Sequence, residues 1–191
     1  MNKLAILTVV IAITGLAKTD SAIQHKDSSK FSEFVETIYE PSLLGTAGTL
    51  LANQNFFENQ DGILLHADNY CEANISELIS THESRPSNCD LTILAFRTST
   101  PETCGILEVS ENQILQKMYE KSSDDHGNLA NAAFYILSKK LISELKNETD
   151  FSNEVIPKYF GKTLVVETSE TFIDIGTPES YAHAQKVAKI L

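Results

Sequence analysis

The pattern of hydrophobic and polar positions in the first half of the chain predicts strands that alternate with helices. Short apolar runs rich in β-branched residues are typical of buried strands, and the amphipathic segments between them are typical of helices. The predicted strands are 7–14, 35–39 and 62–66. The predicted helices are 17–24, 47–55 and 75–82, the last with Asn74 as its N-cap. This alternation indicates a parallel or mostly parallel sheet with helices on its faces.

The second half of the chain has a different pattern, with strand-like runs joined by short polar connections. These runs are "CDLTILAFRT", "CGILEVS", "QILQKMYEK" and "AAFYILS". They predict antiparallel or mixed pairing in this part of the sheet. An amphipathic helix, "KKLISELKN", two further strands, "TLVVET" and "TFIDI", and a closing helix that starts at Pro178 complete the prediction. No repeat or linker interrupts the chain, so residues 1–191 are predicted to form one domain.

Composition and charge narrow the class of protein. The chain has 191 residues, of which 42% are hydrophobic and 21% charged, as in ordinary globular proteins. Its net charge of −11 argues against a nucleic-acid groove or an anionic membrane surface as the partner. Three scattered cysteines without a C-x-x-C pair favour reduced thiols in a cytoplasmic protein and argue against zinc.

The first 22 residues allow two interpretations. Lys3, an apolar run and small residues after it resemble a secretory signal. The same run, "LTVVIAIT", also has the composition of a buried parallel strand. Composition alone does not decide between them.

Two aspartates are candidates for binding a cation. Asp68 follows the predicted strand 62–66, where open α/β sheets bind ligands, and a carboxylate there suits a hard divalent cation. The alternative is that Asp68 shapes a turn together with Asn69. Asp174 lies among apolar residues, where a carboxylate is costly to bury unless it is paired or metal-bound. A local contact with the amides of Gly176 and Thr177 would also account for it.

Three other segments carry groups that suit a polar ligand. The glycines of "LLGTAGTLL", Gly45 and Gly48, allow close backbone approach of a ligand, or form a tight strand-to-helix turn. Glu120, Lys121 and Asn131 offer contacts to sugar hydroxyls and a phosphate. A Glu–Lys pair at a strand end is also typical of a solvated surface.

Taken in order, the motifs of this chain resemble the sugar-1-phosphate nucleotidyltransferases. The segments that carry the resemblance are "VVIAITGLA", "YEPSLLGTAGTLL", "GILLHADNY", "CGILEV", "YEKS", "NLANAAFYIL", "DFSNEVIP" and "FIDIGTPESYAHAQ". The likeness is closest to the branch that uses mannose 1-phosphate or heptose 1-phosphate with GTP. It also favours an internal strand over a secretory signal at the N-terminus.

The resemblance implies a Rossmann-like three-layer α/β/α sandwich with a mixed, mostly parallel sheet. It implies transfer of a nucleoside monophosphate from a nucleoside triphosphate to a sugar 1-phosphate, with release of pyrophosphate, for nucleotide-sugar and surface-polysaccharide biosynthesis. The expected protein is cytoplasmic, with no nucleic-acid or membrane partner, and the sequence leaves open whether it forms a homo-oligomer.

The resemblance also assigns roles to residues. The expected nucleobase contacts are Leu44, Gly45 and Thr46. The residues expected around the sugar phosphate are Gly105, Glu120, Lys121 and Asn131. Asp68 and Asp174 are expected to be catalytic by sharing a Mg²⁺ that touches both phosphates.

Two features depart from the family pattern. The family begins with a strand and a glycine-rich loop, G-G-x-G-T-R-L-x-P-x-T, which grips the triphosphate, and the chain contains no such segment. Ala133 stands where many relatives carry glycine. We therefore expect an N-terminally truncated domain with impaired turnover. The alternatives are a non-catalytic nucleotide-sugar-binding or regulatory subunit and, less favoured by "DIGTP", a metal-dependent glycosyltransferase.

Overall fold

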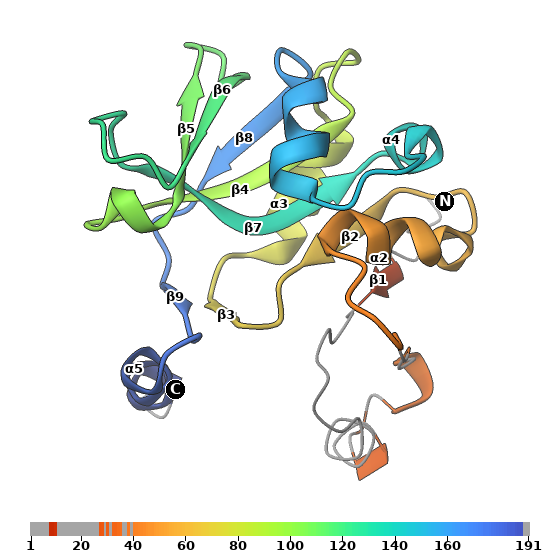
Figure 1. The fold of residues 1–191 in the computed structure, drawn as a ribbon, viewed down its shortest axis with the longest axis horizontal. Coiled ribbons are helices and arrows are strands. Elements are labelled where there is room, and N and C mark those ends of the chain that lie inside the picture. The colour runs from red at the N-terminus through yellow and green to blue at the C-terminus, as the bar shows by residue number, and fades with distance from the viewer. Residues whose placement is uncertain are drawn as a thin grey trace.

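The central sheet is mixed, as the sequence predicts. A computed structural model describes residues 8–10, 27–28, 30, 32–35, 38 and 40–188, and its main row of strands has the order β1-β2-β7-β4-β8 (Figure 1). The strands of this row are β1 (Thr8–Val10), β2 (Gly62–Leu65), β4 (Leu91–Arg97), β7 (Leu129–Leu137) and β8 (Thr163–Glu167). β1 pairs with β2 and β4 with β8 in parallel, whereas β7 is antiparallel to both β2 and β4. In this row β7 alone runs against the common direction.

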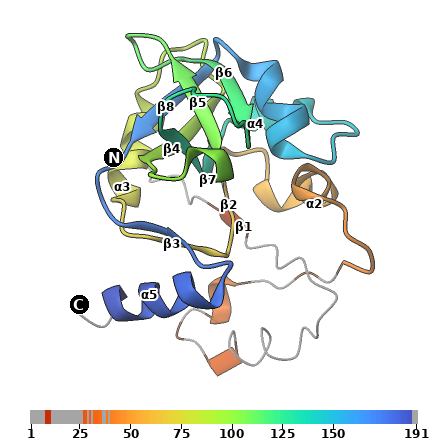
Figure 2. The same ribbon diagram turned by 60° about the vertical axis from the view of Figure 1, so that its left-hand side comes forward.

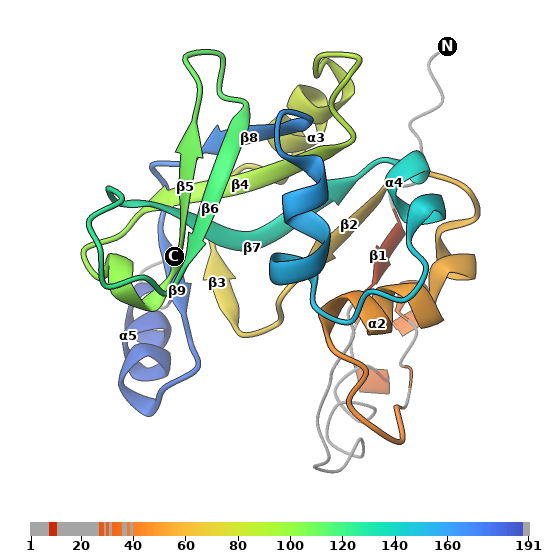
Figure 3. The ribbon, with the colours of Figure 1, turned by 45° about the horizontal axis from the view of Figure 1, so that its top comes forward.

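Two smaller pairs of strands are attached to this row. β5 (Gly105–Val109) and β6 (Leu115–Glu120) form an antiparallel hairpin, and β5 joins the main row where Ile106 pairs with Ala130 of β7. β3 (Asn69–Cys71) and β9 (Phe172–Asp174) form a separate antiparallel ladder. Figures 1 and 3 place the Gly105–Glu120 end of the hairpin on the side of the sheet where β3 and β9 lie.

Helices cover both faces of the sheet. In Figure 2, α3 (Ile75–Glu83) lies on one side, and α2 (Thr46–Ala52) and α4 (Lys139–Glu144) lie on the other. Short helical turns complete the chain: η1 (Ser32–Phe34), η2 (Gln54–Phe57), η3 (Pro101–Thr103), the π-helical η4 (Phe151–Val155) and η5 (Ile156–Tyr159). The last element is α5 (Pro178–Ala188). The predicted three-layer α/β/α sandwich is thus confirmed.

Alternating side chains of the strands build two cores, one on each face. Leu64 and Tyr135 contribute to the core beneath α2 and α4, while their neighbours Ile63 and Phe134 contribute to the core beneath α3. Successive residues of a strand point to opposite faces, so a strand buried on both sides must be apolar throughout. This explains the continuous apolar run of β7, whose last four residues are all buried.

The predicted helix starts are confirmed where the structure describes them. The side chain of Asn74 accepts a hydrogen bond of 3.2 Å from the Glu77 amide at the start of α3. The predicted helix 47–55 ends earlier, because α2 stops at Ala52 and the chain continues as η2. Among the described residues, no helix is both long and apolar enough to span a bilayer.

The strand predicted at 35–39 is wrong for the residues that the structure describes. Neither Val35 nor Ile38 is in a strand, and the Val35 amide donates back to the Ser32 carbonyl after the η1 turn. The Val35 amide thus bonds within a local turn and not to a neighbouring strand. Of the strand predicted at 7–14, Thr8–Val10 is confirmed as β1, and the rest lies outside the described residues, as does the predicted helix 17–24.

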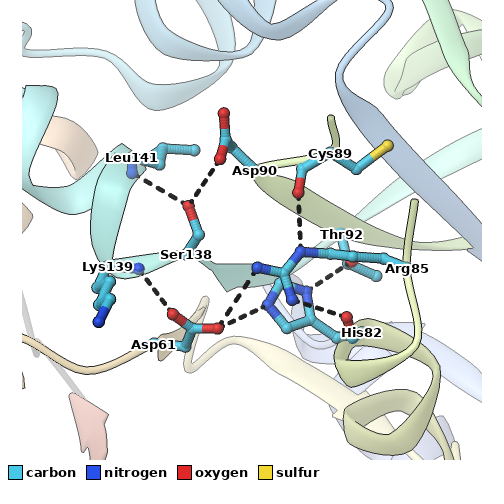
Figure 4. A network of polar contacts seen from close by, with 9 residues as sticks. All are labelled: Asp61, His82, Arg85, Cys89, Asp90, Thr92, Ser138, Lys139 and Leu141. Atoms are coloured by element: carbon cyan, nitrogen blue, oxygen red, sulfur yellow. Dashed lines mark hydrogen bonds and ion pairs between the residues drawn. The ribbon is translucent and has the colours of Figure 1, made fainter. Parts of the chain in front are cut away.

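A polar network around the buried His82, at the amino-terminal ends of β2 and β4, joins the three layers (Figure 4). Asp61, just before β2, accepts from the Lys139 amide at the start of α4 at 2.8 Å. On the other face its second oxygen lies 3.3 Å from His82 Nε2 and 3.5 Å from an Arg85 nitrogen. The Arg85 side chain also donates to the Cys89 carbonyl. One carboxylate thereby connects helices from opposite sides of the sheet.

His82 is neutral in this network. Its Nδ1 lies 2.7 Å from the Thr92 hydroxyl. Because the Asp61 carboxylate can only accept, Nε2 carries the proton and Nδ1 accepts from Thr92. Burial lowers the pKa of His82, an effect that the hydrogen bond to Asp61 only partly opposes. The hydrogen bond from His82 in turn lowers the pKa of Asp61, against the opposing effect of burial.

We predict that the free energy of unfolding falls as the pH is lowered from 7 to 5. The unfolded His82 ring takes up a proton near its ordinary pKa, whereas the buried ring does so only at lower pH, so protons favour the unfolded chain. The slope reaches about 1.4 kcal/mol per pH unit while only the unfolded ring is protonated. Asp61, whose folded pKa is lowered, loses its stabilising effect only at more acidic pH.

Urea denaturation at a series of pH values measures this slope. His82→Gln, which keeps a donor for Asp61 but does not titrate, should flatten it. The control His183→Gln, at an exposed position, should leave the pH dependence of the unfolding free energy unchanged. Equal slopes for His82→Gln and the unchanged protein would contradict the role given to His82.

Candidate functional site

The β3–β9 ladder brings together the backbone segments that carry the two candidate metal ligands, Asp68 and Asp174. Asn69 of β3 pairs with Asp174 of β9, and the carbonyl of Asp68 accepts a hydrogen bond of 2.7 Å from the Ile175 amide. Both aspartates are exposed. The structure therefore places these distant residues at one edge of the molecule, beyond the carboxyl end of β2.

The chemistry of this pair suits a hard cation. The described residues contain no cluster of three or more His, Cys, Asp or Glu side chains arranged to hold a metal. Two carboxylates provide only part of the six or more oxygen ligands of Mg²⁺ or Ca²⁺, the rest coming from water or phosphate. The local alternative for Asp174 is also present, since its Oδ1 accepts from the Gly176 amide at 2.7 Å. That contact uses one oxygen of the carboxylate.

The open end of the β5–β6 hairpin gathers three of the four predicted sugar-phosphate residues. Gly105 pairs with Glu120, and a Cβ on Gly105 would lie 2.7 Å from Glu120 Oε2 and 3.4 Å from Met118 Sδ. Any larger residue would displace the glutamate. The Lys121 amide donates to the Cys104 carbonyl at 3.1 Å, in a left-handed backbone conformation with φ of 46°.

Asn131, the fourth predicted residue, connects this hairpin to β7. Its side-chain nitrogen lies 3.9 Å from Met118 Sδ and donates to the Tyr135 hydroxyl at 2.8 Å. Its side-chain oxygen accepts from the Ala133 amide at 3.0 Å. Asn131 therefore already has protein partners on both ends of its amide, and these contacts fix its orientation.

A bulge in β7 joins Asn131 to the aspartate edge. The register of β4 and β7 shifts between Ile93 and Ala95, and within the bulge Ala133 has a φ of 50°. The His66 amide donates to the Ala133 carbonyl at 3.2 Å, and the Asn69 side chain donates to the Ala132 carbonyl at 3.2 Å. A left-handed conformation costs an alanine about 1–2 kcal/mol, a cost that glycine avoids. The glycine expected here from the family pattern would avoid this cost.

The glycine loop before α2 packs against another part of the same chain. Gly45 has a φ of 78°, and a Cβ there would lie 2.3 Å from the Thr149 carbonyl oxygen. That oxygen also accepts from the amides of Ala47 and Gly48 at 3.0 and 3.4 Å. The Thr46 hydroxyl accepts from the Phe151 amide at 2.9 Å. Close backbone approach is thus required here by the protein itself, and nucleobase contacts by Leu44, Gly45 and Thr46 stay a prediction.

The buried Tyr135 lies where these segments meet. Burial raises the pKa of Tyr135 to about 12, although hydrogen bonds with Asn131 and Ser152 act in the opposite direction. The charges of Glu120 and Asp150 also raise it, so both carboxylates lie near the ring. Tyr135 therefore lies among the hairpin, the β7 bulge and the segment behind the glycine loop.

Glu40, at the beginning of the glycine loop, is a candidate that the sequence pattern did not single out. Its two carboxylate oxygens are shielded from solvent and have no hydrogen-bond partner within the part of the chain that the structure describes. A buried carboxylate without a partner is costly and calls for a ligand. Only its position in "YEPSLLGTAGTLL" could have indicated it, because no spacing rule marks a single glutamate.

Comparisons with known proteins identify the family. A family model described as nucleotidyl transferase matches residues 1–189, and the chain belongs to this family. A relative from Sulfolobus acidocaldarius whose name describes a mannose-1-phosphate guanyltransferase is 25% identical over 178 residues, which cover 91% of this chain and 48% of the relative. A glucose-1-phosphate adenylyltransferase of Clostridium acetobutylicum is 27% identical over 131 residues, 62% of this chain and 34% of its own length.

A solved structure supports the same conclusion. The crystal structure of HddC from Yersinia pseudotuberculosis complexed with GMP-PN superposes with a TM-score of 0.74 at 26% identity, covering 90% of this chain and 75% of that one. The chain spans about half the length of the Sulfolobus relative and less of the Clostridium one. The resemblance to sugar-1-phosphate nucleotidyltransferases is thereby confirmed at the level of the family.

Proposed function

We propose that this domain binds GTP and a sugar 1-phosphate, mannose 1-phosphate being the first candidate, for guanylyl transfer with release of pyrophosphate. The observation that carries the proposal is the set of contacts by which the β7 bulge is bonded to the aspartate edge while Asn131 lies against the hairpin. The aspartate edge suits a phosphate-bound cation, and the open end of the hairpin suits a sugar phosphate. A ligand that uses both would lie across the bulge. Nucleotide-sugar biosynthesis is the setting that such a reaction implies.

Mg²⁺ is the proposed cofactor, held by Asp68 and Asp174. When bound, such an ion neutralises charge on the phosphate oxygens. The chain's own contribution is to hold together the backbone segments that carry these two aspartates through the β3–β9 ladder, with Asn69 bonded to the β7 bulge.

We predict that Asp68→Asn and Asp174→Asn each weaken binding of Mn²⁺, used as a spectroscopic substitute for Mg²⁺, in the presence of GTP. Each change removes a charged oxygen ligand, so we expect at least about a tenfold loss, equivalent to 1.4 kcal/mol. Electron paramagnetic resonance of free Mn²⁺ measures it without any turnover. Asp124→Asn, at an exposed loop position, is the matched control. Unchanged Mn²⁺ affinity in both aspartate variants would exclude this metal site.

The choice of guanine rests on Glu40. Guanine presents two adjacent N–H donors on its pairing edge, which a carboxylate accepts as a bidentate pair, whereas adenine offers a donor beside an acceptor. A carboxylate at the predicted nucleobase loop with no hydrogen-bond partner among the described residues therefore favours guanine.

We predict that Glu40→Gln weakens GTP binding by about 10–100-fold, the equivalent of losing a charge-assisted hydrogen bond. ATP binding, which does not use the carboxylate, should change little. Calorimetric titration with each nucleotide measures the difference, with Glu179→Gln as an exposed control. If the unchanged protein bound ATP as tightly as GTP, the proposed guanine preference would be wrong.

We predict that a polypeptide of these 191 residues releases pyrophosphate from GTP and mannose 1-phosphate at close to the background rate. It contains no G-G-x-G-T-R-L segment, and each missing donor to the reacting phosphate costs about 10²–10³ in rate. A version extended at its amino end by a strand and this loop should be much faster. An assay coupled to inorganic pyrophosphatase measures the rate of pyrophosphate release from both polypeptides.

This comparison of rates distinguishes a nucleotidyltransferase from a non-catalytic binding subunit. Comparable rates from both polypeptides would mean that catalysis does not depend on the loop. Binding of both ligands without turnover, even with the loop, would instead support a nucleotide-sugar-binding or regulatory subunit.

A further inference from the structure

The β5–β6 hairpin is attached to the main sheet at few points. β5 is joined to β7 by the Ile106–Ala130 pair, one residue from the open end. The closed end is joined by the Ile114–Leu164 bridge and by a 2.8 Å bond from the Val165 amide to the Gln113 carbonyl. The open end, with Glu120 and Lys121, has to stay aligned with Asn131 of β7 if all three are to meet one ligand. Among the described strands, β6 pairs only with β5, so a contact made by β6 itself adds to what holds Glu120 and Lys121 in place.

The loop from Lys121 to Asn128, which returns from β6 to β7, supplies such a contact. His126 stacks on Tyr119 of β6, with ring centroids 3.5 Å apart and planes inclined by only 9°. The loop is shaped by Asp125, whose Oδ1 accepts from the Gly127 amide at 3.0 Å. Its far end is tied to β4, since the Thr98 amide donates to the Asn128 carbonyl at 3.0 Å.

The Tyr119 ring is itself held in place from β5 and β6. Its hydroxyl donates to Glu108 Oε2 at 2.7 Å, and Lys117 Nζ lies 4.5 Å from the ring centroid. His126 therefore stacks on a ring whose position is already fixed. The contact ties the loop to the hairpin as a whole.

The stack lies behind the proposed sugar-phosphate residues. Neighbouring strand residues point to opposite faces, and Glu120 points over Gly105 and towards the site, so Tyr119 points away from it. His126 thus contacts the hairpin on the face away from the ligand. His126 can therefore affect a ligand only indirectly, through the position of β6 and of Lys121. Lys121 has a left-handed backbone conformation and begins the loop.

We propose that His126 is a positioning residue for the sugar 1-phosphate half of the site. By stacking on Tyr119 it fixes the loop and the open end of the hairpin, and so holds Glu120 and Lys121 in place before the ligand arrives. The inference rests on the proposed function, since it assigns a partner contact to the same sugar-phosphate residues. A preformed loop spares the ligand the entropy cost of ordering it.

The test compares His126→Ala, His126→Phe and His183→Ala in the 191-residue protein. Removing the ring should weaken mannose 1-phosphate binding about tenfold by calorimetry, because ordering of the loop then accompanies binding. GTP binding should be unchanged. His126→Phe keeps a flat ring and should restore the affinity. In hydrogen exchange without ligand, the Lys121 amide, bonded to the Cys104 carbonyl, should exchange faster only in His126→Ala.

Each outcome separates the inference from the function on which it rests. Unchanged mannose 1-phosphate binding in His126→Ala, with normal binding by the unchanged protein, overturns the positioning role and leaves the proposed function standing. Equal losses of GTP and mannose 1-phosphate affinity, or a lowered melting temperature, show a general structural role and also overturn it. If the unchanged protein binds GTP but no mannose 1-phosphate, the proposed sugar substrate fails and the positioning role fails with it.

Discussion

Strand β7 is the constraint on which the rest of the structure depends. It runs against its neighbours, is buried on both faces, and pairs with β2, β4 and β5. Its bulge at Ala133 interrupts this pairing and frees two carbonyls, which accept from the His66 amide and the Asn69 side chain. Bulges commonly redirect a strand next to functional sites. Here the bulge attaches the turn that carries Asp68 to the strand that carries Asn131.

Much of this arrangement could be predicted from the sequence, because burial on two faces leaves a clear pattern. The apolar runs of β2, β4 and β7, and the Asn74 cap of α3, follow from local chemistry. The strand predicted at 35–39 failed for the opposite reason, since a local turn gave Val35 a partner that hydrophobicity does not reveal. Neither the β3–β9 ladder nor the π-helical turn at Phe151 has a periodic pattern, because both are set by long-range contacts.

The candidate site shows the same division between local and long-range information. Motifs indicated Asp68, Asp174 and the hairpin residues, and the structure brings the hairpin to the β7 bulge and the aspartates to one ladder. Motifs did not indicate why Gly45 is a glycine. The answer is the Thr149 carbonyl, more than a hundred positions away in the chain. A glycine that resembles a ligand contact can serve the packing of the protein first, and both roles use the same lack of a side chain.

The two ends of the sheet divide stability from binding. At the amino-terminal ends of β2 and β4, Asp61 and His82 satisfy each other and connect the helices on both faces, with little solvent contact for the histidine. At the other end, Asp68 and Asp174 are exposed. The carboxylate oxygens of Glu40, in the loop before α2, are buried and have no hydrogen-bond partner among the described residues. Substituting either residue of the Asp61–His82 pair removes a hydrogen-bond partner of the other, so these positions tolerate little change. Groups without a protein partner remain available to a ligand. The groups that are open to a ligand thus lie in the segments where phosphates and a base are proposed to bind. Under that proposal, a protein of net charge −11 would bind anions through a few local groups and a cation.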